Sequence, residues 1–417
     1  AVLCLMSPGA LAIPQSFFGN GFFGPVIPAT PRFGKNLTGD FLTFANWESG
    51  ELPGPWEKAP SFAGRQRQIM SANPILFGAV PSSVVAWSQA GELREIEIQY
   101  LDAGSFFGFK ARGERSHQDR EAGAKRRAEF DDYFAKHLAD LRQRLEEGCG
   151  AGVARRVGNS DLLRQTVTDY RWEDFVLRLI AREGHSVGLS VFRDGGEPDG
   201  FLNPELGALD AKLRAERLAD SAVENERGDV LATGLPIVQQ GHTPFCGVGS
   251  LAMAAGALGL QISQADLEAG AAFRNTGSAR GSRVLELYRA VAEELDMRVT
   301  VSSKFDPRRV RRSIEAGIPV VVWRRVSRER EAAHRLWAER LAREPEARLP
   351  EPSKAEMREW PERKKQSLPS HGSVVCGINI DQSEVVFSEP WGDAARDRRM
   401  RIEEMEATAY AVFYFRF

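Results

Sequence analysis

The sequence has little of what a disulfide framework, a metal centre or a membrane span requires. Its 417 residues include only four cysteines and six histidines. None of these stands in the paired ligand spacing of a CxxC or HExxH motif. We therefore expect no metal and no other cofactor. After residue 12, no segment is long and apolar enough to span a bilayer.

An excess of charge of one sign is also missing. Lysine and arginine number 55, aspartate and glutamate number 57, and the net charge is −2. Such a balance favours neither nucleic acid nor an anionic membrane as a partner. The length and the hydrophobic content of 42% predict an ordinary globular protein of two or three domains.

The first twelve residues, AVLCLMSPGALA, are uncharged and mostly apolar, and they end in the small-x-small pattern of a signal-peptidase site. We interpret residues 1–12 as the remnant of a secretory signal peptide, with the mature chain starting near Ile13. This predicts a secreted, periplasmic or cell-surface protein. The alternative is an apolar N-terminal strand.

Three cysteines remain once Cys4 is removed with that segment. They are too few and too unevenly placed for a disulfide framework, so at least one thiol is free. We expect Cys376 to pack in the core and Cys149, which lies between two glycines after a helix, to be incidental. Cys246 is the cysteine whose surroundings indicate chemistry.

Residues 234–260, GLPIVQQGHTPFCGVGSLAMAAGALGL, predict a helix that begins at Cys246. Apolar residues recur after it at helical spacing, and Pro244 and Gly247 bend the chain into the first turn. The positive end of a helix favours a thiolate over a thiol, which lowers the pKa of the cysteine. The alternative is a small buried cysteine at the start of a core helix.

Gln240 lies six residues before Cys246. Its side-chain amide and the backbone N–H of Cys246 would supply two donors for the oxyanion that forms when sulfur attacks a carbonyl. His242 is a rim residue near Gln240 that could touch a substrate, or an ordinary loop residue.

The stretch HGSVVCGINIDQSEVVFSEPWGD predicts a hairpin with a polar group at each outer end. His371 opens the first strand, and a turn at residues 381–383 would return the chain so that Glu389 lies beside His371. With Cys246 this gives a nucleophile, a base and an orienting carboxylate. Asn379 and Asp381 are rival orienting groups, but both fall near the turn, and each of the three could instead be a solvated loop residue.

Together these motifs resemble the papain-like cysteine peptidases that process bacteriocin leader peptides at double-glycine sites, and their secreted relatives. The resemblance covers about residues 235–417 and implies Cys246 as nucleophile, His371 as base and Gln240 as oxyanion donor. It implies the acid before Pro390 as the third member. That acid is usually Asp in the family, and here it is Glu389.

The fold class that we predict is α+β. After an extended lead-in (residues 13–35), residues 36–233 read as an α+β accessory domain without a chemical constellation. Its signals are strands from about residue 41 to 109, a helix with an apolar stripe that Gly148 ends, a hairpin around residues 175–191 and a helix over 208–226.

Residues 234–417 would then form a papain-like domain, with helices in front and antiparallel strands behind. Asp306 and Pro307 open a helix that Gly317 ends, and an apolar strand follows. The charged, proline-broken segment 324–369 reads as a helical insertion. It would overhang the cleft or form a solvated hairpin without a role.

Two functional hypotheses follow. One is a secreted thiol peptidase that acts on a peptide or protein substrate through a thioester, with acyl transfer or transglutamination as variants of the same chemistry. The other is a binding or scaffold protein that kept the fold but lost the activity, with the accessory domain binding an unknown partner.

Overall fold

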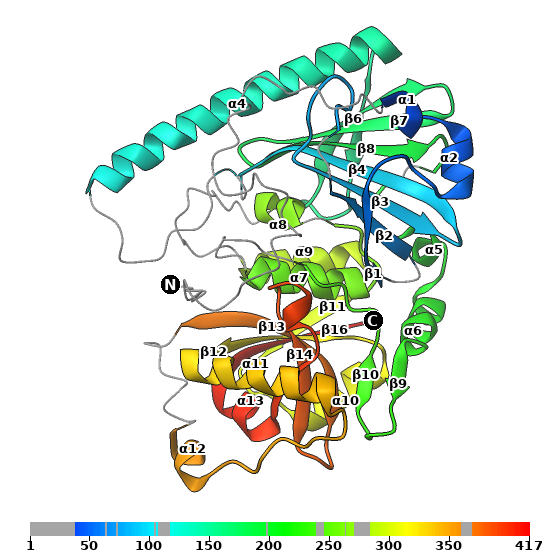
Figure 1. Cartoon of the computed structure of the whole chain (residues 1–417). Helices are drawn as coiled ribbons and strands as arrows, with labels where there is room; N and C mark the ends of the chain where they lie inside the picture. The colour runs from blue at the N-terminus through cyan, green and yellow to red at the C-terminus, as the bar shows by residue number, and fades with distance from the viewer. Residues whose placement is uncertain are drawn as a thin grey trace.

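The computed structural model describes residues 38–62, 65–71, 74–103, 106, 117–196, 199–238, 246–262, 264–270, 284–359 and 369–417. The expected signal segment (1–12) and lead-in (13–35) lie outside the described residues, as do Gln240 and His242. Within the described ranges, no helix is both long and apolar enough to cross a membrane. The described part of the chain is α+β, with two antiparallel sheets (Figure 1).

The first sheet has eight antiparallel strands, and helices cover one of its faces (Figure 1). In spatial order the strands are β1 (Trp56–Phe62), β2 (Arg65–Met70), β3 (Ser83–Gln89), β4 (Glu92–Asp102), β8 (Ser186–Arg193), β7 (Phe175–Arg182), β6 (Gln165–Trp172) and β5 (Val153–Val157). The hairpin predicted around residues 175–191 is confirmed as β7 and β8. Two short helices, α1 (Thr38–Phe41) and α2 (Phe44–Ser49), precede β1, so the prediction of strands from about residue 41 is wrong at its start.

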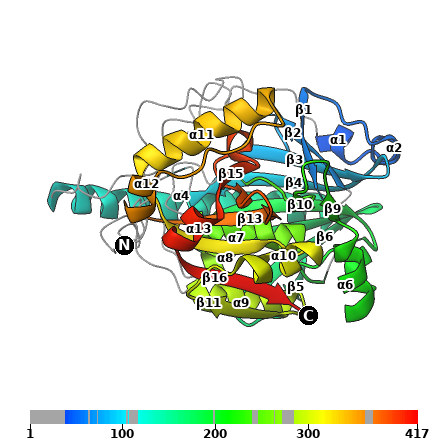
Figure 2. The same ribbon diagram turned by 90° about the horizontal axis from the view of Figure 1, so that it is seen from below.

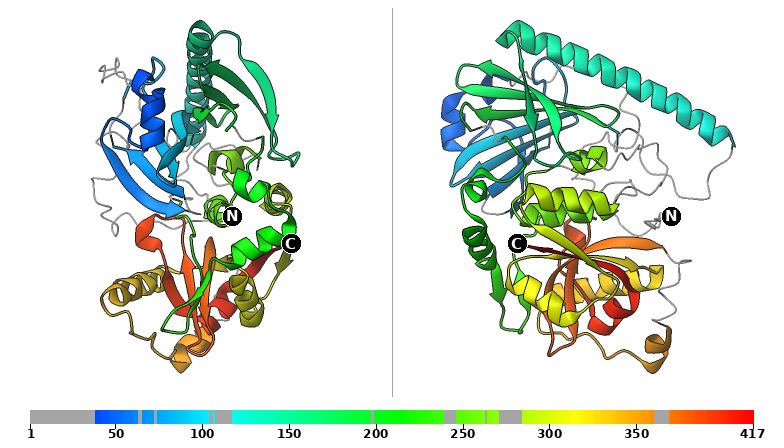
Figure 3. Two further views of the ribbon diagram at one scale, coloured as in Figure 1. Left: turned by 90° about the vertical axis from the view of Figure 1, so that its right-hand side faces the viewer. Right: turned by 180° about the vertical axis from the view of Figure 1, so that it is seen from behind.

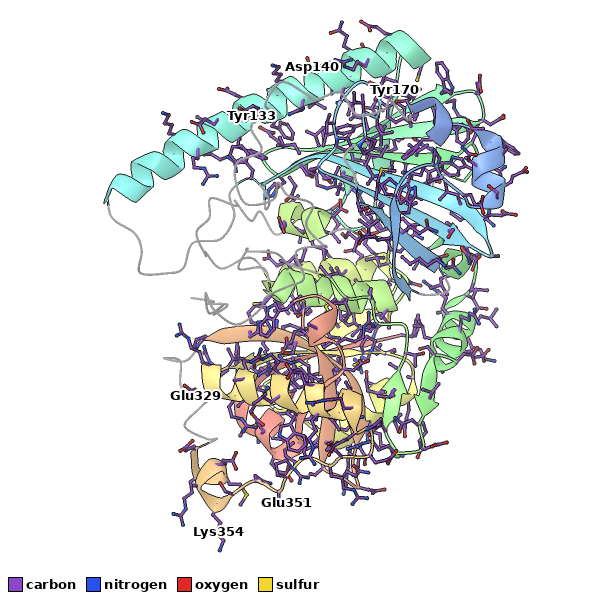
Figure 4. All side chains as sticks on the ribbon, viewed as in Figure 1. Tyr133, Asp140, Tyr170, Glu329, Glu351 and Lys354 are labelled. Atoms are coloured by element: carbon purple, nitrogen blue, oxygen red, sulfur yellow. The ribbon has the colours of Figure 1, made fainter. Side chains whose placement is uncertain are left out.

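The predicted amphipathic helix is α4 (His117–Cys149), which lies along the first sheet and extends beyond it (Figure 1). Its apolar stripe, with Phe130, Leu141 and Leu145, is buried against the sheet. Tyr133 and Asp140, labelled in Figure 4, mark the middle of the helix. The helix ends one residue after Gly148, the predicted stop, and Gly150 (φ 80°) takes a left-handed conformation beyond the helix end.

The second sheet carries the predicted hairpin. In spatial order its strands are β11 (Arg298–Ser302), β16 (Ala409–Arg416), β12 (Val320–Arg325), β13 (Ser370–Asn379), β10 (Val230–Ala232) and β9 (Ala222–Glu224), with β14 (Glu384–Ser388) on β13 and β15 (Arg398–Arg401) on β14. All of these pairs are antiparallel.

Helices cover both faces of the second sheet. On the face toward the first sheet lie α7 (Cys246–Ala257), α8 (Gln264–Gly270) and α9 (Val284–Glu294). On the other face lie α10 (Pro307–Glu315), α11 (Arg328–Arg343) and α13 (Ile402–Thr408), as the view from below shows (Figure 2). The expected helices in front and antiparallel strands behind are present, and α10, α11 and α13 add a further helical layer behind the strands. The apolar run of β12 explains this, because Val321 faces one helical layer and Val320 and Val322 face the other.

Two further corrections concern the junction between the sheets. The helix predicted over residues 208–226 is the shorter α6 (Ala211–Ala219), which a separate short helix, α5 (Pro204–Gly207), precedes and a strand follows. That strand, β9, pairs with β10, and β10 pairs with β13. Residues 222–232 therefore belong to the second sheet, and the boundary expected at residue 233 falls earlier, after α6 (Figure 3).

Buried polar contacts join the first sheet to the helical layer of the second. Glu294 of α9 accepts hydrogen bonds from the backbone N–H groups of Asn159 (2.7 Å) and Ser160 (2.6 Å). Arg182 of β7 forms a buried ion pair with Asp266 of α8. Because buried charges are costly to separate, the first sheet is held against α8 and α9, which lie in the same helical layer as α7 (Figure 3).

The charged insertion forms α11 and α12 (Lys354–Glu359), while residues 360–368 lie outside the described part of the chain. α11 packs beside β15 and α13, on the face of the second sheet opposite α7. It therefore does not overhang the side where Cys246 lies. Glu331 and His334 of α11 contact buried ionic groups, so this helix is only partly solvated.

Candidate active site

Cys246 is the first residue of α7, and its side chain is fully buried. The helix that follows is buried along nearly its whole length, as its small and apolar residues require. α7 is held on β13 by the hydroxyl of Ser250, which donates to the carbonyl oxygen of Gly372 (2.7 Å). A Cβ added at Gly372 would lie only 3.1 Å from the carbonyl oxygen of Cys246. The absence of a side chain at position 372 thus lets Cys246 lie directly against the strand that carries His371.

Strand pairing brings His371 and Glu389 together. Val374 of β13 pairs with Ser388 of β14, so the residue after β14 lies near the start of β13. The imidazole Nε2 lies 2.5 Å from Oε2 of Glu389, and both side chains are buried. Because Nε2 faces the carboxylate, Nδ1 is the ring nitrogen that would exchange a proton with a thiol.

Two more donors hold the other oxygen of Glu389. Oε1 accepts from the hydroxyl of Ser373 (3.0 Å) and from Nη2 of Arg324 (2.6 Å). Burial alone would raise the pKa of Glu389, but His371 and Arg324 outweigh it and hold that pKa below its ordinary value. The carboxylate is therefore ionised and oriented at neutral pH.

Trp391 covers His371. The two ring centroids lie 4.4 Å apart with an interplanar angle of 30°. Trp391 stands two residues after Glu389, in the Glu-Pro-Trp-Gly turn. An indole in this position keeps water from the His371–Glu389 hydrogen bond, and excluding water strengthens that bond.

A second aromatic group, Trp323, lies next to the residue that follows Cys246. Trp323 packs on Gly247, where an added Cβ would lie 2.5 Å from its ring, and its indole N–H donates to the hydroxyl of Tyr288 (3.1 Å). Burial raises the pKa values of Tyr288 and Tyr410, and a negative charge on Cys246 would raise both further. Both phenols therefore stay protonated beside the sulfur.

The two rival orienting groups, Asn379 and Asp381, lie away from His371. Asn379 ends β13, is buried rather than solvated, and donates to the carbonyl oxygen of Arg227 (2.9 Å) and to Asp229 (3.1 Å). Asp381 is exposed in the turn after β13. The turn lies at the end of the hairpin remote from His371, so neither residue contacts the imidazole.

The remaining cysteines are set apart from this site. Cys376 is buried, as expected, with its sulfur 3.8 Å from the hydroxyl of Ser388. Burial and Asp397 raise the pKa of Cys376. Burial also raises the pKa of Cys149. Both thiols are therefore less acidic than an ordinary cysteine.

Sequence reasoning missed Arg324, Ser373 and Trp391. Arg324 directly follows the apolar run of β12, and an arginine at that place is a weak signal of a buried acidic partner. Ser373 could have been found from the two-residue period of the strand, because it shares a face with His371. Within the described ranges, no cluster of three or more His, Cys, Asp or Glu side chains is arranged to hold a metal ion.

One family model matches part of the chain. It describes the C-terminal domain of vWA-MoxR associated proteins (VMAP-C), and it matches residues 261–371. The match runs from just before α8 to His371, so it includes Arg324 and α11 but neither Cys246 nor Glu389. No curated protein and no solved structure matches the chain.

Proposed function

We propose that this chain is a cysteine peptidase of papain-like layout, in which Cys246 attacks the carbonyl of a peptide or protein substrate. The observation that carries the proposal is the buried contact of His371 with Glu389 (2.5 Å), on the strand against which Cys246 packs. A buried histidine that is hydrogen-bonded to an ionised carboxylate, on a strand against which a helix-start cysteine packs, supplies a base for activation of the thiol.

The steps follow from these positions. Nδ1 of His371 takes the proton of the Cys246 thiol, and the imidazolium is stabilised by Glu389 across Nε2. The thiolate adds to the carbonyl carbon, and the backbone N–H of Cys246 and the side chain of Gln240 are the donors proposed for the oxyanion. When the C–N bond breaks, His371 gives its proton to the leaving amine and a thioester remains. Water, deprotonated by His371, then releases the acid and restores the thiol.

The same thioester can transfer its acyl group to acceptors other than water. An amine in place of water would give acyl transfer or transglutamination, because the thioester reacts with any nucleophile that His371 deprotonates. Secretion of the protein also stays a proposal, since it rests on residues 1–12, outside the described part of the chain.

The test is hydrolysis of a peptide library by the purified protein, with and without an added primary amine. We expect wild-type protein to release new termini, and Cys246→Ala to fold normally and release none. Gln240→Ala should lower turnover by roughly 10² to 10³, the cost of losing one oxyanion donor. Turnover by Cys246→Ala near that of the wild type would rule out the proposal.

A second candidate is a binding protein without activity that associates with other proteins. Two observations favour it. Cys246, His371 and Glu389 have no exposed surface in this structure, and the matched family model is named for proteins associated with vWA-MoxR. If a small electrophile does not react with Cys246 and no peptide is cleaved, this second function is the better account.

A further inference from the structure

A chain of buried ion pairs runs from His371 into the insertion. Arg324 of β12 pairs in register with His371 of β13 and is 2% exposed. Its Nη2 donates to Glu389 (2.6 Å) and to Glu331 of α11 (2.9 Å), and its Nε donates to the hydroxyl of Ser373 (2.9 Å). The guanidinium thus joins the carboxylate beside His371 to a helix of the insertion.

We propose that Arg324 is a positioning residue that fixes the Glu389 carboxylate against His371, and that Glu331 of α11 holds Arg324 in place. The inference rests on the proposed function, because it concerns the same histidine. It assigns the insertion a role in the scaffold of the site.

The geometry explains why Glu389 needs such support. A glutamate has one more rotatable bond than aspartate, and its carboxylate turns freely unless both oxygens are engaged. Arg324 and Ser373 both donate to Oε1, which leaves Oε2 for Nε2 of His371. The planar guanidinium serves two carboxylates and a hydroxyl at once, which the single ammonium of a lysine cannot do in the same geometry.

Glu331 is itself held on both sides. Its Oε2 accepts from Nη1 of Arg398 on β15 (2.8 Å), and Nδ1 of His334 lies 3.5 Å from its Oε1. Glu331 lies in the first turn of α11, which begins after the capping residue Ser327. The start of α11 is therefore fixed relative to β12 and β15.

Arg324 and Glu331 have opposite electrostatic effects on the site. The positive charge of Arg324 lowers the pKa of Glu389, whereas the negative charge of Glu331 raises it. For the same reason, removing Arg324 should raise the pKa of His371, and removing the charge of Glu331 should lower it. Arg324 and Glu331 connect the His371–Glu389 pair to further charged and titratable groups, namely His334, Arg398, Glu404 and Arg330.

Four variants of the full chain separate charge from geometry: Arg324→Met, Arg324→Lys, Glu331→Gln and the control Glu329→Gln. Glu329 lies on the same turn of α11, is exposed, and is labelled in Figure 4. The main readout is the titration of His371 by NMR on protein with labelled histidine, with the His371 signal assigned from its loss in His371→Asn. The second readout is the alkaline limb of the pH profile of turnover.

We expect Arg324→Met to raise the pKa of His371 by about one unit, and Glu331→Gln to lower it by a smaller amount. Arg324→Lys should keep that pKa within about half a unit of the wild type yet lower turnover about tenfold, because the charge remains and the fork is lost. Glu329→Gln should change neither quantity. The alkaline limb of the pH profile should move with the pKa of His371.

The inference is overturned if Arg324→Met and Glu331→Gln leave the His371 titration unchanged or shift it in the same direction. If Arg324→Met does not fold, the other two variants still test the inference. Glu331→Gln must lower the pKa of His371, and Arg324→Lys must lower turnover. A wild-type protein without turnover would remove the proposed function alone, because the NMR titration tests the positioning role independently of catalysis.

Discussion

Replacing Glu389 by glutamine should leave the protein folded and lower its turnover by roughly 10² to 10⁴. The carboxylate accepts three hydrogen bonds, from His371 at one oxygen and from Ser373 and Arg324 at the other. An amide has one accepting oxygen and one donating nitrogen, so it cannot serve both sides. If its oxygen stays with Arg324, its N–H₂ faces Nε2 of His371 and forces the proton to Nδ1, the nitrogen that must accept a proton from the thiol.

The opposite orientation of the amide is no better. Its N–H₂ group would then face the Arg324 guanidinium, donor against donor. The magnitude follows from the corresponding Asp to Asn change in a Ser-His-Asp triad, which lowers turnover about 10⁴-fold through the wrong tautomer. The lower bound allows for a thiol that is more acidic than a serine hydroxyl.

The assay is kcat and KM on a cleaved peptide, with thermal unfolding as the control for folding. Glu389→Asp is the matched variant, because it keeps the charge but shortens the reach. We expect its turnover to lie between those of the wild type and Glu389→Gln. A folded Glu389→Gln protein with turnover within about threefold of the wild type would refute the role of Glu389.

Three further predictions test other parts of the structure. Gly372→Ala would place a Cβ 3.1 Å from the carbonyl oxygen of Cys246, so we expect the free energy of unfolding in urea to fall by about 1–3 kcal/mol and turnover to fall as well. Unchanged stability and turnover would contradict the close packing. Asn379→Ala should destabilise the protein by about 1–3 kcal/mol, because the hydrogen bonds to Arg227 and Asp229 are lost, and it should leave kcat unchanged. A large fall in kcat would make Asn379 a rival to Glu389 again. Burial would raise the pKa of Glu404, but His334 and Arg330 lower it from 4.5 to about 2. This shift contributes roughly 3 kcal/mol to the stability of the folded protein above pH 4.5, and the contribution is lost as the pH falls through about 2. Glu404→Gln should therefore be much less stable than the wild type at pH 7, and the difference in their free energies of unfolding should shrink below pH 4.5. An equal difference at pH 3 and pH 7 would contradict this.

Local sequence signals predicted much of the second half of the chain. Asp306 caps α10 through the backbone N–H groups of Arg308 and Arg309, as expected from Asp-Pro at a helix start, and Gly317 (φ 69°) follows the end of α10. The hairpin of β13 and β14 also follows from alternation and its turn. These features depend on residues close together in the chain, which is why they could be found without a structure.

What could not be predicted depends on contacts between distant residues. Glu389 and Arg324 are 65 positions apart, and the sequence around each residue gives no sign of its partner. The charged composition of α11 indicates a solvated surface, yet Glu331 and His334 are drawn inward by Arg324, Arg398 and Glu404. The place of β9 and β10 in the second sheet was missed for a similar reason, since each has only three residues and pairs with a partner that the local pattern does not reveal.

The central claim is that Cys246 is an activated thiol, and the rate of its alkylation against pH tests this most directly. Iodoacetamide is applied to the folded protein from pH 5 to pH 10, and mass spectrometry maps the modified cysteine. The account predicts that Cys246 reacts well below pH 8, and that His371→Asn moves its reaction to the pH of an ordinary thiol. Cys149 and Cys376, whose pKa values are raised, should stay unmodified below pH 8. A Cys246 that fails to react below pH 8, or that reacts with the same pH dependence in His371→Asn, would contradict the claim.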